Sequence, residues 1–428
     1  MLPSPNFSAL PPTTRYIKVW PAPCRPHRRH TWAIIAIVGS RRLLVFVGAV
    51  FLAESAFYAI VPPLVPSFVH DLGMTTTEIG VLVAAYPAGL LVAALPSIAL
   101  VNAKGVRTTT AVGLGTLVVA TFGFAWGGSP VLLDAARFVQ GLGGAVMWTG
   151  ALAWLTSEAE PGRRGTAIGG AVSAALIGMV IGPAIGAAAF RFGRGPIFSL
   201  MALVMVALAL SRPAARDASA ARRDWFLHVR QLFRSRIANL GNALLLVVGV
   251  VNGTIASLVP LLVTRRQGGS ATIAIMFAAT YLVSAAINAS AGRLSDRFGR
   301  ITPTLVGLGL SGLIIPFLPQ IGPLALLAIA TVVASSLVSG LWTPTAAMVS
   351  DGADPGPAGQ SVAVATMNAA WAAGISGGAI AVSRLADAYG FNLPFIVVGC
   401  ACFAAAVASF LSYRVASSGR EKAARVTA

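Results

Sequence analysis

The stretch GRLSDRFGR, residues 292–300, decides how this chain is organised. It joins two long apolar segments, 270–291 and 301–319, through a turn of a few polar residues. Gly292 allows two helices to approach closely, and Gly299 permits the backbone to turn sharply where the chain reverses. A short charged turn between two such apolar segments predicts two membrane-spanning helices that meet at one face of a bilayer.

The composition of the whole chain points to the same environment. Of its 428 residues, 56% are hydrophobic and only 10% are charged, and the mean hydropathy is +0.80. A soluble domain carries roughly a quarter charged residues, so an aqueous surface cannot be assembled here. We therefore expect an all-α membrane protein whose main partner is the lipid bilayer.

Apolar windows between turn residues predict twelve membrane-spanning helices in two halves of six. The first six spans are 43–68, 77–101, 108–127, 130–156, 165–190 and 195–211, and the second six are 237–263, 270–291, 301–319, 322–349, 360–384 and 391–413. The predicted organisation is a basic tail (1–42), an N-terminal six-helix bundle (43–211), a connection (212–236), a C-terminal six-helix bundle (237–413) and a second tail (414–428).

The positive charges lie in alternate loops. With both termini in the cytoplasm, 25 of the 31 lysines and arginines fall on the cytoplasmic side, five fall on the other side, and Arg137 lies within a span. This is the positive-inside pattern. The net charge of +18 therefore indicates loops that meet anionic lipid headgroups, with no nucleic-acid partner. We expect a multi-pass protein of the bacterial cytoplasmic (inner) membrane with both termini inside.

The connection contains an amphipathic segment, residues 223–234. Its apolar side chains fall on one helical face, and its arginines lie elsewhere. This pattern predicts a helix that lies in the cytoplasmic membrane interface, and the alternative is a helix that binds a partner protein. The apolar face consists of Trp225, Phe226, Val229, Leu232 and Phe233.

The two halves repeat one another in sequence. Gly105 and Gly299 occupy matching points after the second span of each half, 194 residues apart. The pair Gly178–Gly182 recurs as Gly374–Gly378 at an offset of 196. Two homologous six-span halves are typical of transporters whose substrate site lies between the repeats near the bilayer midplane.

The loop between the eighth and ninth spans carries a family resemblance. Its spacing G-x-L-x-D-R-x-G-R resembles the signature loop of the major facilitator superfamily, with Gly292, Asp296, Arg297, Gly299 and Arg300 at the matching positions. The first-half copy is degenerate, since Asn102 stands in place of the aspartate and Ile98 in place of the first glycine.

The start of the fourth span resembles another motif of that family, R-x-x-Q-G. Arg137, Gln140 and Gly141 match it, and Asp134 precedes them by one helical turn. An arginine within hydrocarbon costs at least ~2.5 kcal/mol, so it needs a partner or a wet cavity. Two interpretations stay open: Arg137 faces the transport cavity, or it pairs with Asp134 near the outer surface.

The fifth span resembles the so-called antiporter motif of proton-coupled drug exporters. Glycines four residues apart make a flat face for close helix packing, and a proline frees a backbone carbonyl and bends the helix. The matching residues are Gly178, Gly182, Pro183 and Gly186. The run AIVPPLVP at 59–66 also resembles the start of twelve-span drug:proton antiporters.

The resemblance implies two pseudo-symmetric six-helix bundles, the major facilitator fold, that work by alternating access. It further implies proton-coupled efflux of a small organic compound such as a drug, antibiotic or metabolite. A proton gradient would be the energy source, with no cofactor. The fold commonly works as a monomer. No catalytic or metal-ligand constellation is present in the spans, so we do not expect an enzyme.

Glu54 is the acidic residue that lies near the middle of a span. Burial disfavours a charged carboxylate unless a cation lies nearby. We predict that Glu54 carries the coupled proton and pairs with Arg137, and the alternative is a structural glutamate bonded to Tyr58. Aromatic and amide side chains in the spans suit amphipathic ligands. The candidate cavity residues are Tyr58, Tyr86, Trp148, Asn252, Asn288, Trp342, Asn368 and Trp371.

Two other functions remain open at this point. One is a proton-coupled importer of a nutrient or organic anion, in which Arg137 holds a carboxylate. The other is a non-transporting sensor or assembly protein on the same scaffold, which the degenerate loop at Asn102 favours. The substrate itself cannot be read from the sequence, because function depends on cavity side chains carried by a shared fold.

Overall fold

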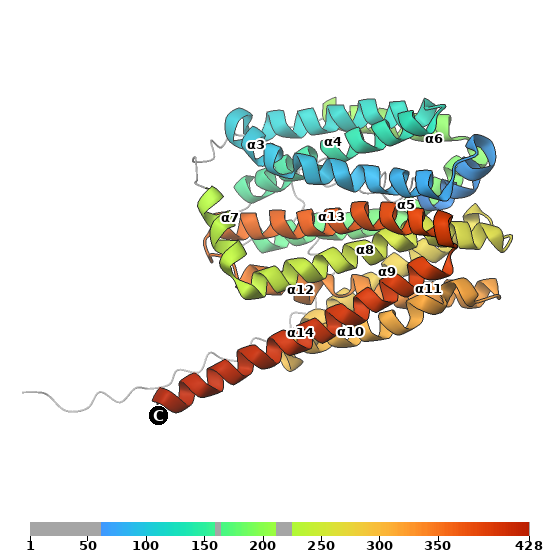
Figure 1. Ribbon diagram of the computed structural model, residues 1–428. Helices are drawn as coiled ribbons and strands as arrows, with labels where there is room; N and C mark the ends of the chain where they lie inside the picture. The colour runs from blue at the N-terminus through green and yellow to red at the C-terminus, as the bar shows by residue number, and fades with distance from the viewer. Residues whose placement is uncertain (1–60, 159–163, 211–224, 428) are drawn as a thin grey trace, which may run out of the picture. The chain divides into compact units, whose positions relative to one another are not determined.

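The computed structural model describes residues 61–158, 164–210 and 225–427, and this part of the chain contains helices and no strand (Figure 1). Residues 61–72 are helical. The further helices are α3 (Thr76–Trp126), α4 (Pro130–Glu158), α5 (Arg164–Phe192), α6 (Arg194–Leu210), α7 (Trp225–Arg234), α8 (Arg236–Arg265), α9 (Ser270–Phe298), α10 (Ile301–Ile314) with a 3-10 turn (Ile315–Gln320), α11 (Leu324–Ser339), α12 (Trp342–Asp351), α13 (Pro357–Tyr389) and α14 (Asn392–Thr427).

The helices fall where the spans were predicted, with three differences. Helix α3 runs through the second and third spans, and Gly105 is the non-helical residue between them. The tenth span is broken into α11 and α12, and α14 continues as a helix to Thr427, past its predicted end. Most of the first span, 43–68, lies outside the described residues. Within the described part, eight helical segments are long and apolar enough to cross a membrane. The prediction of an all-α membrane protein is therefore confirmed.

Backbone geometry repeats between the two halves. Six described residues have positive φ, and they form three pairs at nearly constant offsets. Gly105 (φ 78, ψ 167) and Gly299 (φ 81, ψ 158) share almost the same conformation, as expected of matching turns. This conformation favours glycine at both sites. The other pairs are Gly73 with Gln267 and Gly193 with Gly390.

Helix α3 begins at a capping box. The Thr75 side chain accepts a bond from the Glu78 amide, and the Glu78 carboxylate accepts one from the Thr75 amide at 2.7 Å. The two bonds satisfy donors that a helix start leaves open. They fix where α3 starts and therefore which of its faces meets α4.

The glycines that recur in the eleventh span lie at a close helix contact. A Cβ on Gly374 would lie 2.1 Å from the Leu246 carbonyl oxygen, and one on Gly378 would lie 2.8 Å from the Val250 Cα. Gly249 approaches the Trp371 carbonyl in the same way. Helices α8 and α13 thus pack backbone against backbone, as glycines four apart allow.

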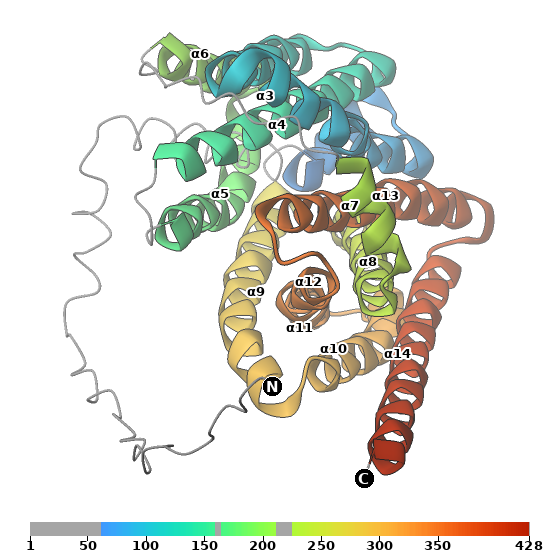
Figure 2. The ribbon, with the colours of Figure 1, turned by 90° about the vertical axis from the view of Figure 1, so that its left-hand side faces the viewer.

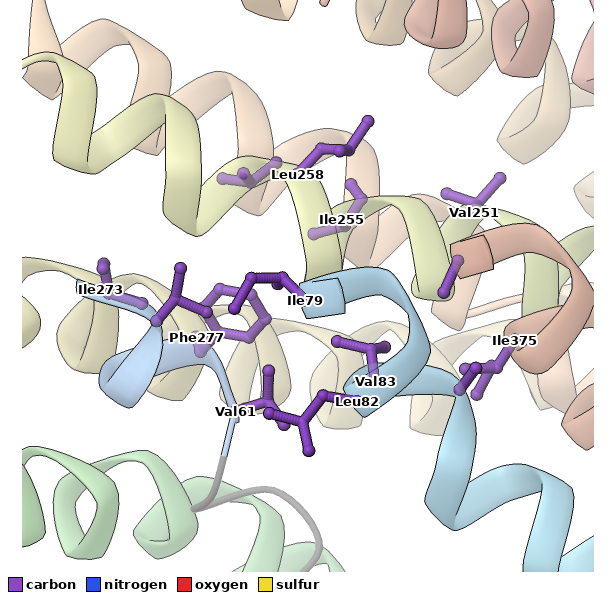
Figure 3. Packing of buried hydrophobic residues seen from close by; sticks show 14 of the residues in the cluster. Val61, Ile79, Leu82, Val83, Val251, Ile255, Leu258, Ile273, Phe277 and Ile375 are labelled. Carbon is purple, nitrogen blue, oxygen red and sulfur yellow. The ribbon is translucent and has the colours of Figure 1, made fainter. Parts of the chain in front are cut away.

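A shared apolar core joins the halves of the chain (Figure 3). Helix α3 packs on α13, and α5 packs on α9. Figure 3 shows first-half side chains beside second-half ones: Val61, Ile79, Leu82 and Val83 lie with Val251, Ile255, Leu258, Ile273, Phe277 and Ile375.

Polar bonds tie the start of α3 to the end of α13. The Asp387 carboxylate accepts bonds from the Thr77 hydroxyl at 2.6 Å and from the Thr77 amide at 2.8 Å. The Ser376 hydroxyl donates to the Ala84 carbonyl at 3.1 Å. Burial raises the pKa of the Asp387 carboxyl, but hydrogen bonds from Thr77 and Thr76 together lower it by more than burial raises it. The pKa of Asp387 therefore lies below the ordinary aspartate value. These contacts hold the two halves together at the end predicted to face outward.

Helix α7 divides its apolar side chains between two environments. Leu232 is buried against α8 and α13, in a small cluster with Ala238, Leu245 and Val362. Phe233, the next residue, is 58% exposed, and Leu227 is 57% exposed. The single apolar face predicted from the sequence is therefore split between the protein and its surroundings.

Candidate coupling and substrate site

A buried polar cluster surrounds Arg137, which lies two turns into α4. We call Arg137, Gln140, Thr121 and Tyr86 the Arg137 cluster. Arg137 is 1% exposed, and its Nη1 donates to Gln140 Oε1 at 2.9 Å. Gln140 Nε2 then donates to Thr121 Oγ1 at 3.1 Å. The guanidinium carbon lies 4.7 Å from the centre of the Tyr86 ring, within the range of a cation–π contact.

Glycines bring the helices of this cluster together. A Cβ on Gly141 would lie 2.0 Å from the Tyr86 carbonyl oxygen, and one on Gly89 would lie 2.1 Å from the Phe138 carbonyl oxygen. A Cβ on Gly144 would lie 2.6 Å from the Tyr86 hydroxyl. The R-x-x-Q-G motif therefore has two functions in one helix turn: Arg137 and Gln140 supply polar groups, and Gly141 lets α3 approach closely enough for Tyr86 to face them.

Two of the contacts of Arg137 are with Gln140 and the Tyr86 ring. Asp134, one turn earlier, is partly buried, and its Oδ1 has no hydrogen-bond partner among the described residues. Glu54 and Tyr58, the predicted partner and its neighbour, lie outside the described residues.

A second polar group lies in the other half, around the break in the tenth span. We call Asn252, Asn288, Ser339 and Thr343 the Asn288 network. Asn288 Nδ2 donates to the Ser339 carbonyl at 3.1 Å, and the Thr343 hydroxyl donates to Asn288 Oδ1 at 2.9 Å. The Ser339 hydroxyl donates to Asn252 Oδ1 at 3.4 Å. Four side chains from α8, α9, α11 and α12 therefore meet at one point.

The break itself has a cause in the sequence. Pro344 lacks an amide hydrogen, and its ring crowds the carbonyl four residues earlier, which belongs to Gly340. Helix α11 ends at Ser339, and α12 begins at Trp342. The side chain of Asn288 satisfies the Ser339 carbonyl at this point. Broken helices near the bilayer midplane are how many transporters present backbone polar groups to a ligand.

The remaining cavity candidates lie close to this network or apart from both groups. Trp342 and Trp371 form an edge-to-face ring pair, with centres 5.9 Å apart and planes at 85°. Asn368 is partly exposed on α13, and Trp148 packs partly buried against the apolar core. The structure thus brings Tyr86 to Arg137, Asn252 to Asn288 and Trp342 to Trp371, whereas Asn368 and Trp148 belong to neither cluster.

The family motifs take their predicted positions in helices and turns. Gly178, Gly182 and Gly186 are buried in α5, which also contains Pro183. Arg297 lies in the last turn of α9. Arg300 Nε lies 2.6 Å from the Asp351 carboxylate, an ion pair that the sequence did not reveal. Gly292 and Asp296 belong to α9, and the surroundings of these two residues are outside what the structure describes.

Sequence reasoning missed the groups that complete both clusters. Thr121, Ser339 and Thr343 are small hydroxyl residues inside apolar runs, where most such residues bond to their own helix backbone. The sequence held one signal of the break in the tenth span: Pro344, four residues after Gly340, marks where a helix carbonyl loses its amide donor. Among the described residues, no group of histidine, cysteine or acidic side chains could hold a metal ion.

Comparison with known proteins agrees with this architecture. The sequence profile of the Major Facilitator Superfamily matches residues 46–367 and 244–427. The MFS-type transporter ppzB of Metarhizium rileyi is 37% identical over 98 residues, which are 23% of this chain and 20% of that protein. The probable vesicular acetylcholine transporter-B of Danio rerio is 28% identical over 177 residues, 39% of this chain and 36% of that one. The matches therefore span about a fifth and just over a third of these relatives.

Solved structures share the fold at low sequence identity. A bacterial homolog of the human lysosomal transporter Spinster, inward-facing and unoccupied, matches with a TM-score of 0.75 and 16% identity, over 88% of this chain and 98% of that one. The nucleoside transporter NupG matches with a TM-score of 0.71 and 12% identity, over 86% and 99%. Because the profile covers nearly all of its length and the fold agrees, this chain belongs to the Major Facilitator Superfamily, a family of multi-pass membrane transporters.

Proposed function

We propose that this protein is a proton-coupled antiporter that exports a small organic compound by alternating access. The observation that carries the proposal is the buried Arg137 cluster. A fully buried arginine in a membrane helix costs at least ~2.5 kcal/mol and marks a functional site by default. Its neighbours Gln140 and Tyr86 hold the guanidinium in one orientation.

Glu54 is the group that Arg137 would control. A carboxylate in a span keeps its proton more readily when it is desolvated and loses it more readily beside a cation. In the proposed cycle, Glu54 pairs with Arg137 until a proton or the substrate loosens the pair. Exchange follows because the two compete for one site and bind the two facing states with different affinities.

The Asn288 network and the Trp342–Trp371 pair are the proposed contacts for the organic cargo. Neutral amides supply hydrogen bonds, and two indole rings supply apolar surface, which together suit an amphipathic molecule. The cargoes named for similar proteins, acetylcholine and nucleosides, are also small organic molecules. A monomer in a bacterial cytoplasmic membrane remains part of the proposal, and the similar curated proteins come from a fungus and a fish.

The test is proton flux in liposomes that contain the purified protein and a pH gradient. Aromatic amines and nucleosides are added as candidate cargoes. We expect cargo-triggered proton release with wild type, none with Glu54→Gln, and wild-type release with Asp71→Asn. Asp71 is a matched control, since it is an exposed carboxylate beside His70.

Other outcomes would count against the proposal. Cargo accumulation in the same direction as the protons would favour the importer. Undiminished flux through Glu54→Gln would exclude that residue as the coupling acid. Absence of flux with every cargo, in protein that retains its wild-type melting temperature, would count against transport of this class of compound.

A further inference from the structure

A groove on the outside of the second half lies apart from both polar clusters. It has a volume of about 470 Å³ and lies between α9, α10 and α11, next to the break in the tenth span. Figure 2 shows α9 and α10 joined at one end of the molecule, with α11 beside them. Leu282 on one wall is 62% exposed, and Val306 on the other is 54% exposed. Because these helices cross the membrane, the groove opens to lipid.

The walls of the groove suit an alkyl chain. Nearly all lining residues are apolar, including Ala286, Leu337 and Leu341. The two hydroxyl groups among them are already bonded to their own helices. Ser290 donates to the Ala286 carbonyl, and Thr302 donates to the Phe298 carbonyl, each at 3.0 Å. The groove therefore offers no unused donor to a polar cargo along its length.

Two arginines lie at the end of this groove that is predicted to be cytoplasmic. Arg293 and Arg297 follow Ala286 and Ser290 by seven residues, so they continue the same stripe of α9 beyond the apolar part. Both are exposed. The nearby Arg300 is occupied by its ion pair with Asp351.

We propose that this groove binds one phospholipid with an anionic headgroup. An acyl chain lies along α9 and α10, and the phosphate lies against Arg293 and Arg297. We choose an anionic lipid because of the positive charge of Arg293 and Arg297, since basic pockets between membrane helices on the cytoplasmic side select anionic headgroups. The apolar groove matches the acyl chain, which lies deep in the bilayer, and its cationic end matches the headgroup, which lies at the bilayer surface.

The bound chain would also contact the break in the tenth span. Gly340 and Leu341 line the groove, and a Cβ on Gly340 would lie 2.3 Å from Ile287 Cγ2. The acyl chain and the Asn288 network thus lie on two sides of the same break. Lipid binding does not depend on the transport proposal, since the groove and its arginines are separate from Glu54 and Arg137.

Native mass spectrometry of the whole purified protein tests the proposal. The protein is mixed with equal amounts of phosphatidylglycerol and phosphatidylcholine that carry the same acyl chains. We expect wild type to retain phosphatidylglycerol preferentially. An arginine near an anionic headgroup contributes roughly fivefold in binding, so Arg293→Gln with Arg297→Gln should reduce this preference about thirtyfold. Arg191→Gln with Arg384→Gln, two exposed arginines at the opposite end, should leave it unchanged.

Two variants test whether the chain occupies the groove. Ala286→Phe fills one wall and Val306→Phe the other, and either should remove the lipid adduct while the arginines remain. The melting temperature identifies a variant that fails to fold, in which case the other variant decides. Equal retention of both lipids by wild type would overturn the proposal. Retention of phosphatidylglycerol by both filled variants would also overturn it, because the arginines would then act as a surface charge alone.

Discussion

A single methyl group at Gly141 should separate α3 from α4 and disturb the Arg137 cluster. A Cβ at this position would lie 2.0 Å from the Tyr86 carbonyl oxygen and 3.0 Å from the Gly89 Cα. Both neighbours are backbone atoms, so no side chain can rotate to make room. The Gly141→Ala variant must therefore move one helix against the other.

The distances give the size of this effect. Ordinary contact of a Cβ begins near 3.4 Å, so α3 has to retreat by about 1.4 Å. If Tyr86 moves with its helix, its ring centre shifts from 4.7 Å to about 6 Å from the Arg137 guanidinium, the limit of a cation–π contact. Overpacking of this kind costs ~1–3 kcal/mol. For a chain of 428 residues, we expect the melting temperature to fall by about 1–3 °C.

Thermal unfolding of the detergent-purified protein measures the effect, with Gly115→Ala as the matched control. Gly115 lies within α3, the helix that packs against Gly141, and a Cβ there would meet nothing within 4 Å. The control should be neutral or slightly stabilised, since alanine favours a helix over glycine. Equal melting temperatures for Gly141→Ala and Gly115→Ala would refute the close-packing argument.

Three further predictions follow from the described contacts. Asn288→Leu should destabilise the protein by ~1–3 kcal/mol, measured by thermal unfolding, because it removes the amide that donates to the Ser339 carbonyl and accepts from the Thr343 hydroxyl. An unchanged melting temperature would show that the network is not needed for stability. Arg137→Lys keeps the charge but loses the planar group that lies over the Tyr86 ring. Cargo-driven proton flux should therefore drop while the protein stays folded. Wild-type flux through this variant would exclude a role for the guanidinium geometry. The pKa of Asp387 is lowered in the folded protein, so its contribution to stability is present above the ordinary aspartate pKa near 3.9 and is lost as the pH falls through the lowered value. The melting temperatures of wild type and Asp387→Asn should differ at pH 6, and the difference should shrink as the pH falls below about 3.9. A difference that stays constant into acid would contradict this.

The sequence predicted the features that depend on local chemistry. The lengths of the apolar segments predicted where the helices lie, since a bilayer leaves few alternatives to a continuous helix. Glycines indicated where the chain turns: Gly105 and Gly299 both take the positive-φ conformation expected of a sharp reversal. Arg137 and Gln140 stood out because charged and amide groups are rare in apolar runs, and the structure joins them.

Features that depend on packing between distant segments could not be predicted in the same way. The Asn288 network needs four helices to converge, and no spacing in the sequence specifies that Ser339 meets Asn252. The contact between Thr77 and Asp387 joins residues 310 positions apart. Single-sequence patterns describe one helix at a time, whereas these contacts depend on how helices from both halves are placed.

If helix α7 lies in the membrane interface, as the sequence predicts, it gives the bilayer a mechanical connection to the second half of the chain. Leu232 is anchored in the protein at 1% exposure, while the neighbouring Phe233 is 58% exposed and available to the lipid surface. A tilt of the second half would pull the Phe233 ring through the headgroup layer, and transfer of such a side chain out of an apolar environment costs ~1.5–3 kcal/mol. With α7 in the interface, bilayer thickness and lateral pressure would enter the free-energy difference between conformations, so a stretched membrane and a relaxed one would set different resting populations of the same protein.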